Sequence, residues 1–381
     1  MKIKNITAKY IFDGNNLLEN KLLQIQNNTI FAIKEYTTDT KDVINLGDGV
    51  ISPGFIDLQL NGCGGVLFND DISFDALQIM YDTCLKFGTT SFLPTLITTT
   101  LDDIKKALDI VDKWIKTYGM HKGVVGIHLE GPYISHQKHG IHNDTYIINP
   151  KDEDLLYIAE YAHKFPVKLT IAPEVFTIEQ ITQLKNKGVI LSIGHSNADY
   201  KTAKNAIDSG VKTATHVFNA MSGLLGRHPG VVGAIMNSGC YGGVIADLMH
   251  VDAANIELLH KIKKDKLYIV TDAVTPLGVN IAKFKFADKT IFVSDKKCID
   301  VNGTLAGANI SMPESIKNCV TACNISLLDA LKMAISIPAK VINLHNSFTQ
   351  LKSLSIEIAI YTDLTTFECT PLSKYFKHNC N

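Results

Sequence analysis

From about residue 51 onward, short apolar runs alternate with segments in which apolar residues recur at helical spacing. Continuous apolar runs bounded by turn residues are typical of buried strands, and recurrence at every third or fourth position is typical of amphipathic helices. The clearest helices span residues 101–119 and 198–210, and both segments end at a glycine, which commonly stops a helix. Eight candidate strands alternate with such segments, at residues 55–60, 90–96, 124–130, 168–174, 190–196, 213–219, 243–250 and 266–273.

Eight alternating strand and helix units predict an α/β fold of the (β/α)8 TIM-barrel type, which would occupy residues 51–345 as the catalytic domain. A doubly wound parallel sheet is the alternative that the same alternation allows. Residues 326–342 have the spacing of a closing helix. Residues 283–305 alternate as strands do and predict a β insertion within the barrel domain.

The two ends of the chain have a different pattern. Residues 1–50 contain short alternating strands, two of them joined across Asn27 and Asn28, and no convincing helix. Residues 346–381 have strand character again. We expect the two terminal segments to pair and to form one small β-sandwich subdomain beside the barrel.

At 381 residues the chain is long enough to bury the core of a barrel and of a small second domain. Its formal net charge is -1 and its lysines are spread along the sequence, so it lacks the basic field that binds nucleic acid. No apolar run approaches the roughly 20 residues that cross a bilayer, and the first residues lack the apolar centre of a signal peptide. We therefore expect a cytoplasmic protein that binds neither nucleic acid nor membranes.

Arg227 is the only arginine in a chain that has 37 lysine and arginine residues in total. A guanidinium group can bind phosphate or carboxylate through two parallel hydrogen bonds, which the ammonium group of lysine cannot do. A single arginine in a lysine-rich chain can also be an ordinary surface residue, so composition alone leaves both interpretations open. The Gly- and Pro-rich loop around Arg227 begins a few residues after His216, which favours a role in binding an anion.

Several predicted strands end in residues that bind metals or transfer protons, namely Glu130, His195, His216 and Asp272. A TIM barrel brings the carboxyl ends of its strands to one face, so these side chains are expected to converge there. Two histidines and a carboxylate can hold a divalent metal with one position open for water, and Asp272 can then act as acid and base. Such a metal lowers the pKa of bound water to about 7, which fits hydrolysis of an amide-like bond.

A histidine near the end of a strand is, by itself, more often a hydrogen-bonded structural residue than a metal ligand. The joint occurrence of four suitable residues at equivalent strand ends is what indicates a metal site. His128 lies two residues before Glu130 and therefore on the same side of its strand. It could support the site or be an ordinary core histidine.

A resemblance to a known family rests on short segments that occur in order between about residue 50 and residue 343: PGFIDLQLNGCGG, LPTLITT, HLEGPY, GHSNA, HVFNAM, GRHPG and VTDA. Together they resemble the N-acetylglucosamine-6-phosphate deacetylases of the amidohydrolase superfamily. The resemblance implies a TIM-barrel enzyme of amino-sugar catabolism. The family reaction removes acetate from the amide of the sugar phosphate and yields glucosamine 6-phosphate.

The resemblance also implies one divalent metal ion per subunit, held by Glu130, His195 and His216, with zinc expected and ferrous iron as the alternative. In amidohydrolases generally, the first strand supplies two histidines for a second metal. Gln59 and Asn61 stand at those positions here, and amide side chains are poor metal ligands. A single-metal enzyme is therefore implied.

By the same resemblance, Asp272 would act as general base and then as acid, and His142 would polarise the acetyl carbonyl. The sugar phosphate would contact Asn219, Ala220 and Arg227, and Arg227 would reach into the site of the neighbouring subunit of a homodimer. Further substrate-binding positions that the resemblance implies are Ile141, Asp247, His250, Leu305, Ala306 and Gly307.

Residues 351–364 depart from the family, because only the strand character of its usual strand–turn–strand is retained. Two other functions stay open. One is another amidohydrolase, a cyclic amidase or a deaminase acting on an uncharged ring, which Arg227 speaks against. The other is a non-catalytic scaffold, which would be expected to lose the candidate ligands, whereas all of them are present.

Overall fold

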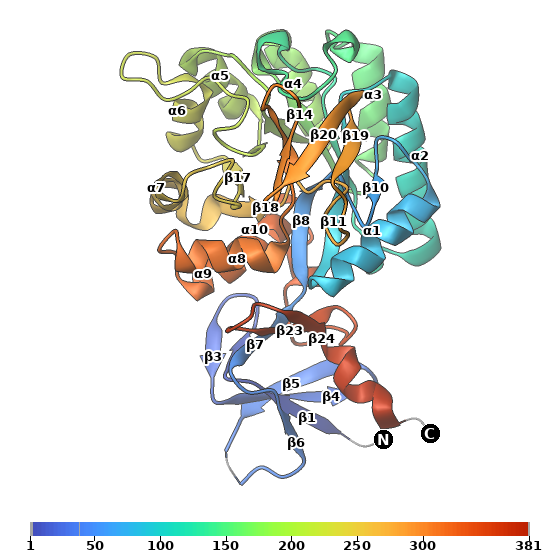
Figure 1. Ribbon diagram of the computed structural model, residues 1–381, viewed down its shortest axis with the longest axis vertical. Coiled ribbons are helices and arrows are strands. Elements are labelled where there is room, and N and C mark those ends of the chain that lie inside the picture. The colour runs from blue at the N-terminus through green and yellow to red at the C-terminus, as the bar shows by residue number, and fades with distance from the viewer. Residues whose placement is uncertain (1–2, 38, 380–381) are drawn as a thin grey trace.

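The computed structural model describes residues 3–37 and 39–379, and its larger part is a barrel of parallel strands (Figure 1). One sheet contains nine strands, of which β12 (Gly123–Val124) is a short extension beside the second barrel strand. The other eight pair in parallel in chain order. They are β8 (Phe55–Leu60), β11 (Thr89–Ile97), β13 (Ile127–Glu130), β14 (Val167–Ile171), β15 (Ile190–Ile193), β16 (Thr213–Ala214), β17 (Tyr241–Ile245) and β18 (Leu267–Val270).

The barrel closes where the chain after β18 meets the end of β8. Leu60 and Ala273 form a parallel bridge. On one side of it the N–H of Asp272 donates to the carbonyl of Gln59 at 3.0 Å, and on the other the N–H of Asn61 donates to Ala273 at 2.9 Å. A doubly wound sheet would leave these two edges apart, so the TIM-barrel prediction is confirmed and the alternative is excluded.

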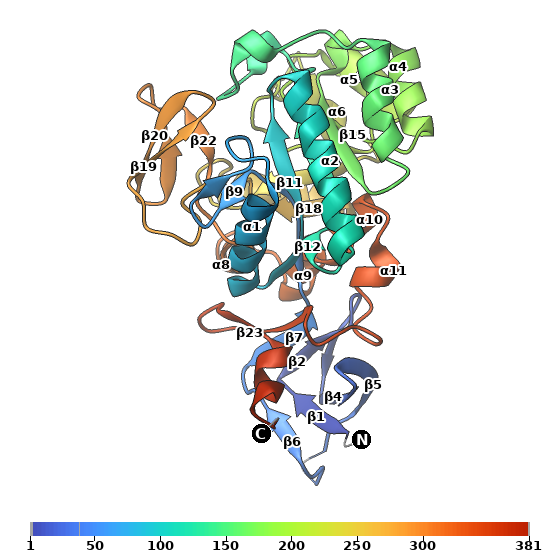
Figure 2. The ribbon, with the colours of Figure 1, turned by 90° about the vertical axis from the view of Figure 1, so that its right-hand side faces the viewer.

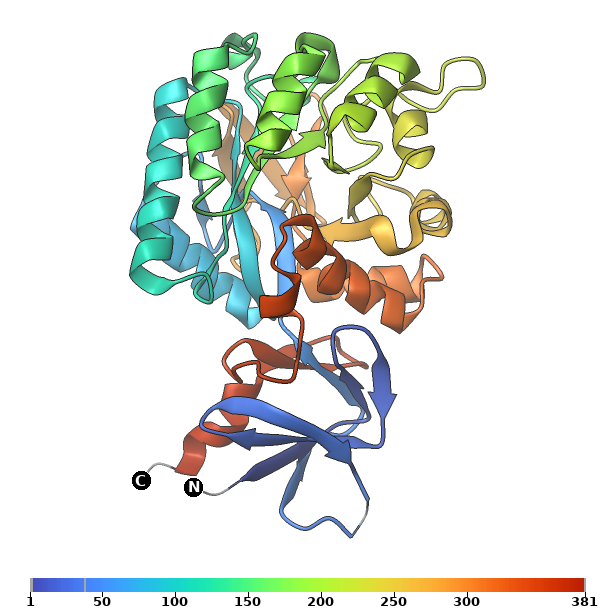
Figure 3. The ribbon, with the colours of Figure 1, turned by 180° about the vertical axis from the view of Figure 1, so that it is seen from behind.

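Helices between the strands cover the outside of the barrel, as the cyan-to-green helices in Figure 3 show. The predicted helices are confirmed: the Thr100 side chain caps the first, which ends before Gly119, and the second ends before Gly210. The helices of the barrel are α1 (Phe74–Lys86), α2 (Leu101–Tyr118), α3 (Asp152–Tyr161), α4 (Ile178–Asn186), α5 (Tyr200–Ser209), α6 (Gly230–Met236), α7 (Ala253–Lys263) and α8 (Met312–Thr321). Within the described part of the chain, none combines the length and apolar character of a membrane span.

The closing helix predicted over residues 326–342 is in fact two helices, α9 (Leu327–Ala334) and α10 (Ser336–Val341). The backbone leaves helical geometry at Ile335, where φ is -128° and ψ is -68°. Pro338 explains the break, because proline has no N–H and its ring clashes with the carbonyl four residues earlier, here that of Ala334.

The smaller part is a sandwich of two sheets made from both ends of the chain. One sheet has the order β5-β4-β1-β6 and the other β24-β23-β7-β2-β3. Their apolar faces share one core that includes Ile6, Leu23, Ile51 and Tyr361. The strands are β1 (Lys4–Thr7), β2 (Tyr10–Phe12), β3 (Leu17–Glu19), β4 (Lys21–Gln26), β5 (Thr29–Glu35), β6 (Val43–Asn45), β7 (Gly49–Pro53), β23 (Ala359–Asp363) and β24 (Cys369–Pro371).

The chain passes from the sandwich to the barrel at Gly54, between the end of β7 at Pro53 and the start of β8 at Phe55. The return connection comes after α10, and β23 then pairs antiparallel with β7. We propose that sandwich and barrel are the two domains of the chain. The first boundary then lies a few residues beyond residue 50, because β7 continues the sheet of the sandwich.

The sequence pattern predicted strands throughout the carboxyl-terminal segment, but the structure also contains helices there. The segment begins with α11 (His345–Phe348) and ends with a 3-10 helix, η5 (Leu372–Asn379). Leu372 and Phe376 lie four residues apart and are both buried in the core of the sandwich. The burial of these two apolar side chains holds the final segment against the sandwich.

Residues 283–308 form a four-stranded antiparallel sheet that projects from the barrel beside β9, as Figure 2 shows. Phe284, Phe286 and Ile291 of this sheet pack against Ile97 at the end of β11 and Ile141 in the loop after β13. The insertion therefore covers one side of the face where the strands end. Its strands are β19 (Lys283–Phe286), β20 (Lys289–Ser294), β21 (Lys297–Ile299) and β22 (Leu305–Ala308), and β9 (Gly62–Cys63) pairs with β10 (Val66–Leu67) beside it.

Candidate active site

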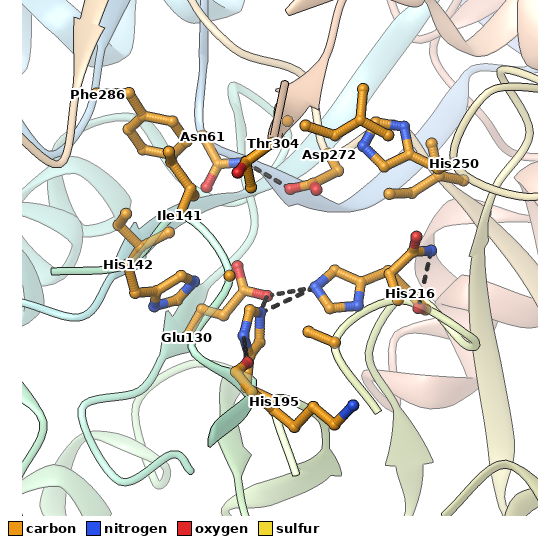
Figure 4. A pocket seen from close by; sticks show the side chains of 18 of the residues that line it. Asn61, Glu130, Ile141, His142, His195, His216, His250, Asp272, Phe286 and Thr304 are labelled. Carbon is orange, nitrogen blue, oxygen red and sulfur yellow. Dashed lines mark hydrogen bonds and ion pairs between the residues drawn. The ribbon is translucent and has the colours of Figure 1, made fainter. Parts of the chain in front are cut away.

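A cavity of about 360 Å³ opens at the carboxyl ends of the barrel strands, between the strand ends and the β insertion (Figure 4). Most of the residues that the sequence predicted for a site line this cavity. They are Glu130, Ile141, His142, His195, His216, Asn219, Ala220, His250, Asp272, Leu305 and Gly307.

Three predicted residues lie outside the lining that the described residues form: Arg227, Asp247 and Ala306. Arg227 is exposed on the loop before α6, which projects from the barrel in Figure 1. Ala306 is fully buried in the apolar core of the β insertion. Asp247 supports a residue of the lining, because its carboxylate lies 2.6 Å from Nδ1 of His250.

Glu130, His195 and His216 form a buried cluster whose ligand atoms all lie within 4.8 Å of one another. Oε1 of Glu130 is 2.9 Å from Nε2 of His216 and 3.2 Å from Nε2 of His195. The two Nε2 atoms are 3.1 Å apart. All three side chains point toward one spot in Figure 4.

The hydrogen bonds around His195 fit a cation at this spot. Its Nδ1 donates to the carbonyl of Lys138 at 2.9 Å, so Nε2 is the ring nitrogen that faces Glu130 and is placed to bind a metal. Electron-rich atoms that face one another in a buried site repel unless a cation lies among them. The donor set of two imidazoles and a carboxylate therefore fits a divalent metal, with room left for water.

The backbone at the strand ends is unusual at three of the functional positions. The φ angles of His195, His216 and Asp272 are 47°, 26° and 51°, in the left-handed region that residues other than glycine seldom adopt. Each such residue costs about 1–2 kcal/mol, and these residues cluster at functional sites. The turn that follows each strand thus directs a ligand or acid side chain into the cavity.

Asp272 lies beside this cluster and is almost fully buried. The amide groups of Asn61 and Gln59 donate to its Oδ1 at 2.6 and 2.9 Å. Burial and the charge of Glu130 raise the pKa of Asp272, and the hydrogen bond from Asn61 is among the interactions that oppose the rise. A carboxyl group with a raised pKa is suited to exchange protons near neutral pH.

His142 faces the cavity from the loop after β13. Its Nδ1 is 2.8 Å from the hydroxyl of Thr98 and 3.4 Å from the backbone N–H of the same residue. Because a backbone N–H can only donate, we infer that Nδ1 accepts and that Nε2 carries the proton. Burial and the neighbouring His195 hold the pKa of His142 well below its usual value. A neutral imidazole that donates from Nε2 can polarise a carbonyl group.

Comparison with known proteins identifies the family. Residues 50–351 match the Amidohydrolase family. The chain belongs to the amidohydrolase family. It is 42% identical over 326 residues to N-acetylglucosamine-6-phosphate deacetylase of Haemophilus influenzae, with 84% of each chain covered.

Two further comparisons agree with this assignment. The chain is 36% identical over 344 residues to N-acetylgalactosamine-6-phosphate deacetylase of Shewanella sp. (strain ANA-3), covering 88% of this chain and 86% of the relative. The crystal structure of N-acetylglucosamine-6-phosphate deacetylase from Pasteurella multocida has a TM-score of 0.90 and 39% identity and covers 97% of both chains.

Some residues of this amidohydrolase site were missed from the sequence. Lys138 and Gln137 line the cavity from the loop after β13, and Phe286 and Thr304 line it from the β insertion. None of them ends a barrel strand, and Gln137, Lys138 and Thr304 belong to no regular pattern. Phe286 alone carried a signal, because it alternates with Phe284 along β19.

His128 is a core residue one layer below the candidate metal ligands. Its Nδ1 is 3.2 Å from the hydroxyl of Thr95, and its Nε2 is 2.7 Å from that of Thr170. Burial is the main reason why its pKa lies well below the usual value. Both ring nitrogens are therefore occupied by hydroxyl groups inside the barrel, and His128 is not a ligand candidate.

Lys168 on β14 is fully buried inside the barrel, and its Nζ has no hydrogen-bond partner within residues 3–37 and 39–379. Burial lowers the pKa of its ammonium to about 8 from 10.5, although the carboxylates of Glu130, Asp272 and Asp57 oppose the shift. Below about pH 8 the lysine is charged in both the folded and the unfolded protein. In that range its burial destabilises the folded protein most, because its pKa is lower in the folded protein than in the unfolded chain.

We expect Lys168→Met to raise the free energy of unfolding by about 1–3 kcal/mol at pH 7, because an apolar chain of similar volume removes a buried charge. The unfolded chain binds more protons between pH 8 and pH 10.5, so wild-type stability rises in that window and the advantage of methionine shrinks. Urea unfolding of metal-free protein at pH 7 and pH 10 measures this. Lys106→Met, at an exposed position, is the control, and a loss of stability in Lys168→Met would contradict the prediction.

Proposed function

We propose that the protein is a metal-dependent N-acetylglucosamine-6-phosphate deacetylase of amino-sugar catabolism, working in the cytoplasm. It hydrolyses N-acetyl-D-glucosamine 6-phosphate to D-glucosamine 6-phosphate and acetate. The observation that carries the proposal is the buried cluster of Glu130, His195 and His216 beside Asp272, in a chain 42% identical to a deacetylase of that name.

Glu130, His195 and His216 would hold one divalent metal ion per subunit, with zinc proposed and ferrous iron as the alternative. Bound there, the ion would supply Lewis-acid chemistry, lowering the pKa of water and polarising the acetyl carbonyl. The amide side chains of Gln59 and Asn61 support a single ion, because both donate N–H groups to carboxylates.

The remaining chemistry belongs to the side chains around the ligands. Asp272 takes the proton of the attacking water as the new C–O bond forms, and then gives it to the sugar nitrogen as the C–N bond breaks. His142 donates from Nε2 to the carbonyl oxygen, where negative charge develops. Asp247 holds His250, which lines the sugar side of the cavity with Ile141, Leu305 and Gly307.

We propose that the sugar phosphate contacts Asn219, Ala220 and the arginine of a second subunit. Nδ2 of Asn219 is tied to the carbonyl of His216 at 3.2 Å, so its orientation is set before substrate binds. Leu224 and Leu225, in the same loop as Arg227, are 52% and 64% exposed. Two exposed leucines beside an exposed arginine suit a loop that docks on the partner of a homodimer.

We expect elemental analysis of fully active protein to give one equivalent of divalent metal per chain. His216→Ala removes one of three proposed ligands and should lose both metal and acetate release. His142→Ala is the matched control, because it removes a histidine of the same cavity that is not a proposed ligand. It should keep the metal and lose turnover only. Two equivalents in fully active protein would contradict the single-metal proposal.

Asp272→Asn should keep the metal and lose turnover, because an amide has the same size but cannot accept a proton from water. We expect kcat for acetate release to fall by roughly two to four orders of magnitude, the range for a lost acid–base group. A variant with metal content and kcat near those of wild type would remove Asp272 from the mechanism.

Arg227→Lys should lower kcat/KM for the phosphorylated sugar by about one to two orders of magnitude, because one ammonium group cannot replace two parallel donors. Activity on unphosphorylated N-acetylglucosamine should barely change. Equal losses on both sugars would make Arg227 a structural residue instead.

Mixed dimers of Arg227→Ala and Asp272→Asn chains should regain activity, because one of the two sites would then hold both an intact Arg227 and an intact Asp272. If activity did not return, the proposal that the arginine reaches the neighbouring subunit's site would be contradicted.

A further inference from the structure

Gln59 and Asn61 lie where the barrel closes, and both side chains reach the same oxygen of Asp272. Nδ2 of Asn61 is 2.6 Å and Nε2 of Gln59 is 2.9 Å from Oδ1 of Asp272, and Figure 4 shows the first of these bonds. A carboxylate offers only acceptors, so each amide must present its NH₂ end to it. Oδ1 therefore accepts two hydrogen bonds from side chains of one strand end.

Gln59 also links the two acidic groups of the site. Its Nε2 is 3.1 and 3.2 Å from the two carboxylate oxygens of Glu130, in addition to the bond to Asp272. A primary amide has two N–H groups, which is the number needed to serve both carboxylates. Two buried like charges repel, and a shared donor between them lowers the cost of holding them side by side.

The orientation of both amides is set by these carboxylates. Gln59 and Asn61 are 0% and 1% exposed, and within the described residues their carbonyl oxygens have no hydrogen-bond partner. A buried polar atom without a partner costs about 1–3 kcal/mol. The amides keep their NH₂ groups on Asp272 and Glu130 although this leaves both carbonyl oxygens without a protein donor.

We propose that Gln59 and Asn61 are positioning residues that hold Asp272 through Oδ1 and leave Oδ2 as the oxygen that exchanges the proton. The proposal rests on the proposed deacetylase function. Two donors on one oxygen fix the rotation of the carboxylate, and no side chain of the described residues donates to Oδ2. The two amides thus orient the carboxylate of Asp272, in addition to being poor ligands for a second metal.

A double-mutant cycle tests this role. Asn61→Leu removes the donors with little change of shape, and kcat for acetate release should fall about 10- to 100-fold, as when other supporting partners of a site are lost. KM and metal content should stay near wild type. In the Asp272→Asn background the same substitution should have little further effect, because no base is left to position. Gln59→Leu and the smaller Asn61→Ala should likewise lower kcat in the wild-type background and have little further effect in the Asp272→Asn background.

Asn69→Leu is the matched control, because among the described residues the Asn69 side chain hydrogen-bonds only to the backbone of Ile97, at the edge of the cavity. Asn69→Leu should change kcat by the same factor in the wild-type background and in the Asp272→Asn background. If Asn61→Leu also lowered kcat by the same factor in both backgrounds, the positioning role would be overturned.

A crystal structure of the Gln59→Leu, Asn61→Leu double variant provides a test that does not depend on turnover. The carboxylate of Asp272 should be rotated, or spread over two orientations, relative to wild type. An unchanged orientation would overturn the proposal. Absence of acetate release by wild-type protein would instead contradict the deacetylase function, so the two failures can be told apart.

Discussion

Hydrogen bonds between the end of β8 and the chain after β18 close the barrel, and they also bring together the groups that make the site. Gln59 and Asn61 come from one edge and Asp272 from the other, so the same contact that completes the sheet joins two amides to a carboxylate. Had the sheet remained open, its first and last strands would lie at opposite edges. Closure is therefore a structural and a functional requirement at once.

Burial of acidic groups is the second constraint. Glu130, Asp272 and Asp57 are all buried in or below the barrel mouth, and an isolated charge there is costly. The structure balances them in different ways. Histidines face Glu130, amides face Asp272, and Thr271 donates to Asp57, whose pKa burial raises to about 7. A divalent cation among the ligands would complete this balance.

Much of the fold and site could be predicted because both depend on simple periodicities. Alternating strands and helices define a barrel, and strand ends such as Glu130 and Asp272 identify its functional face. The sequence prediction missed the helix break at Ile335, although Pro338 signals it. The burial of Ala306 follows from strand alternation, because Leu305 and Gly307 on either side of it face the cavity. Lys138 could not be predicted, because its position depends on a loop and not on a regular element.

The β insertion adds a tertiary constraint that no local pattern encodes. Its strand β22 meets the chain after β18, where the N–H of Ala308 donates to the carbonyl of Asp272 at 2.9 Å. Gly307 makes this approach possible, since its φ is +68° and a Cβ would lie 2.5 Å from the Val274 side chain. The peptide of Asp272 is thus held by β8 on one side and by β22 on the other. Such double anchoring stabilises a left-handed backbone at a residue that would otherwise avoid it, and it ties the proposed base to the sheet that covers the cavity.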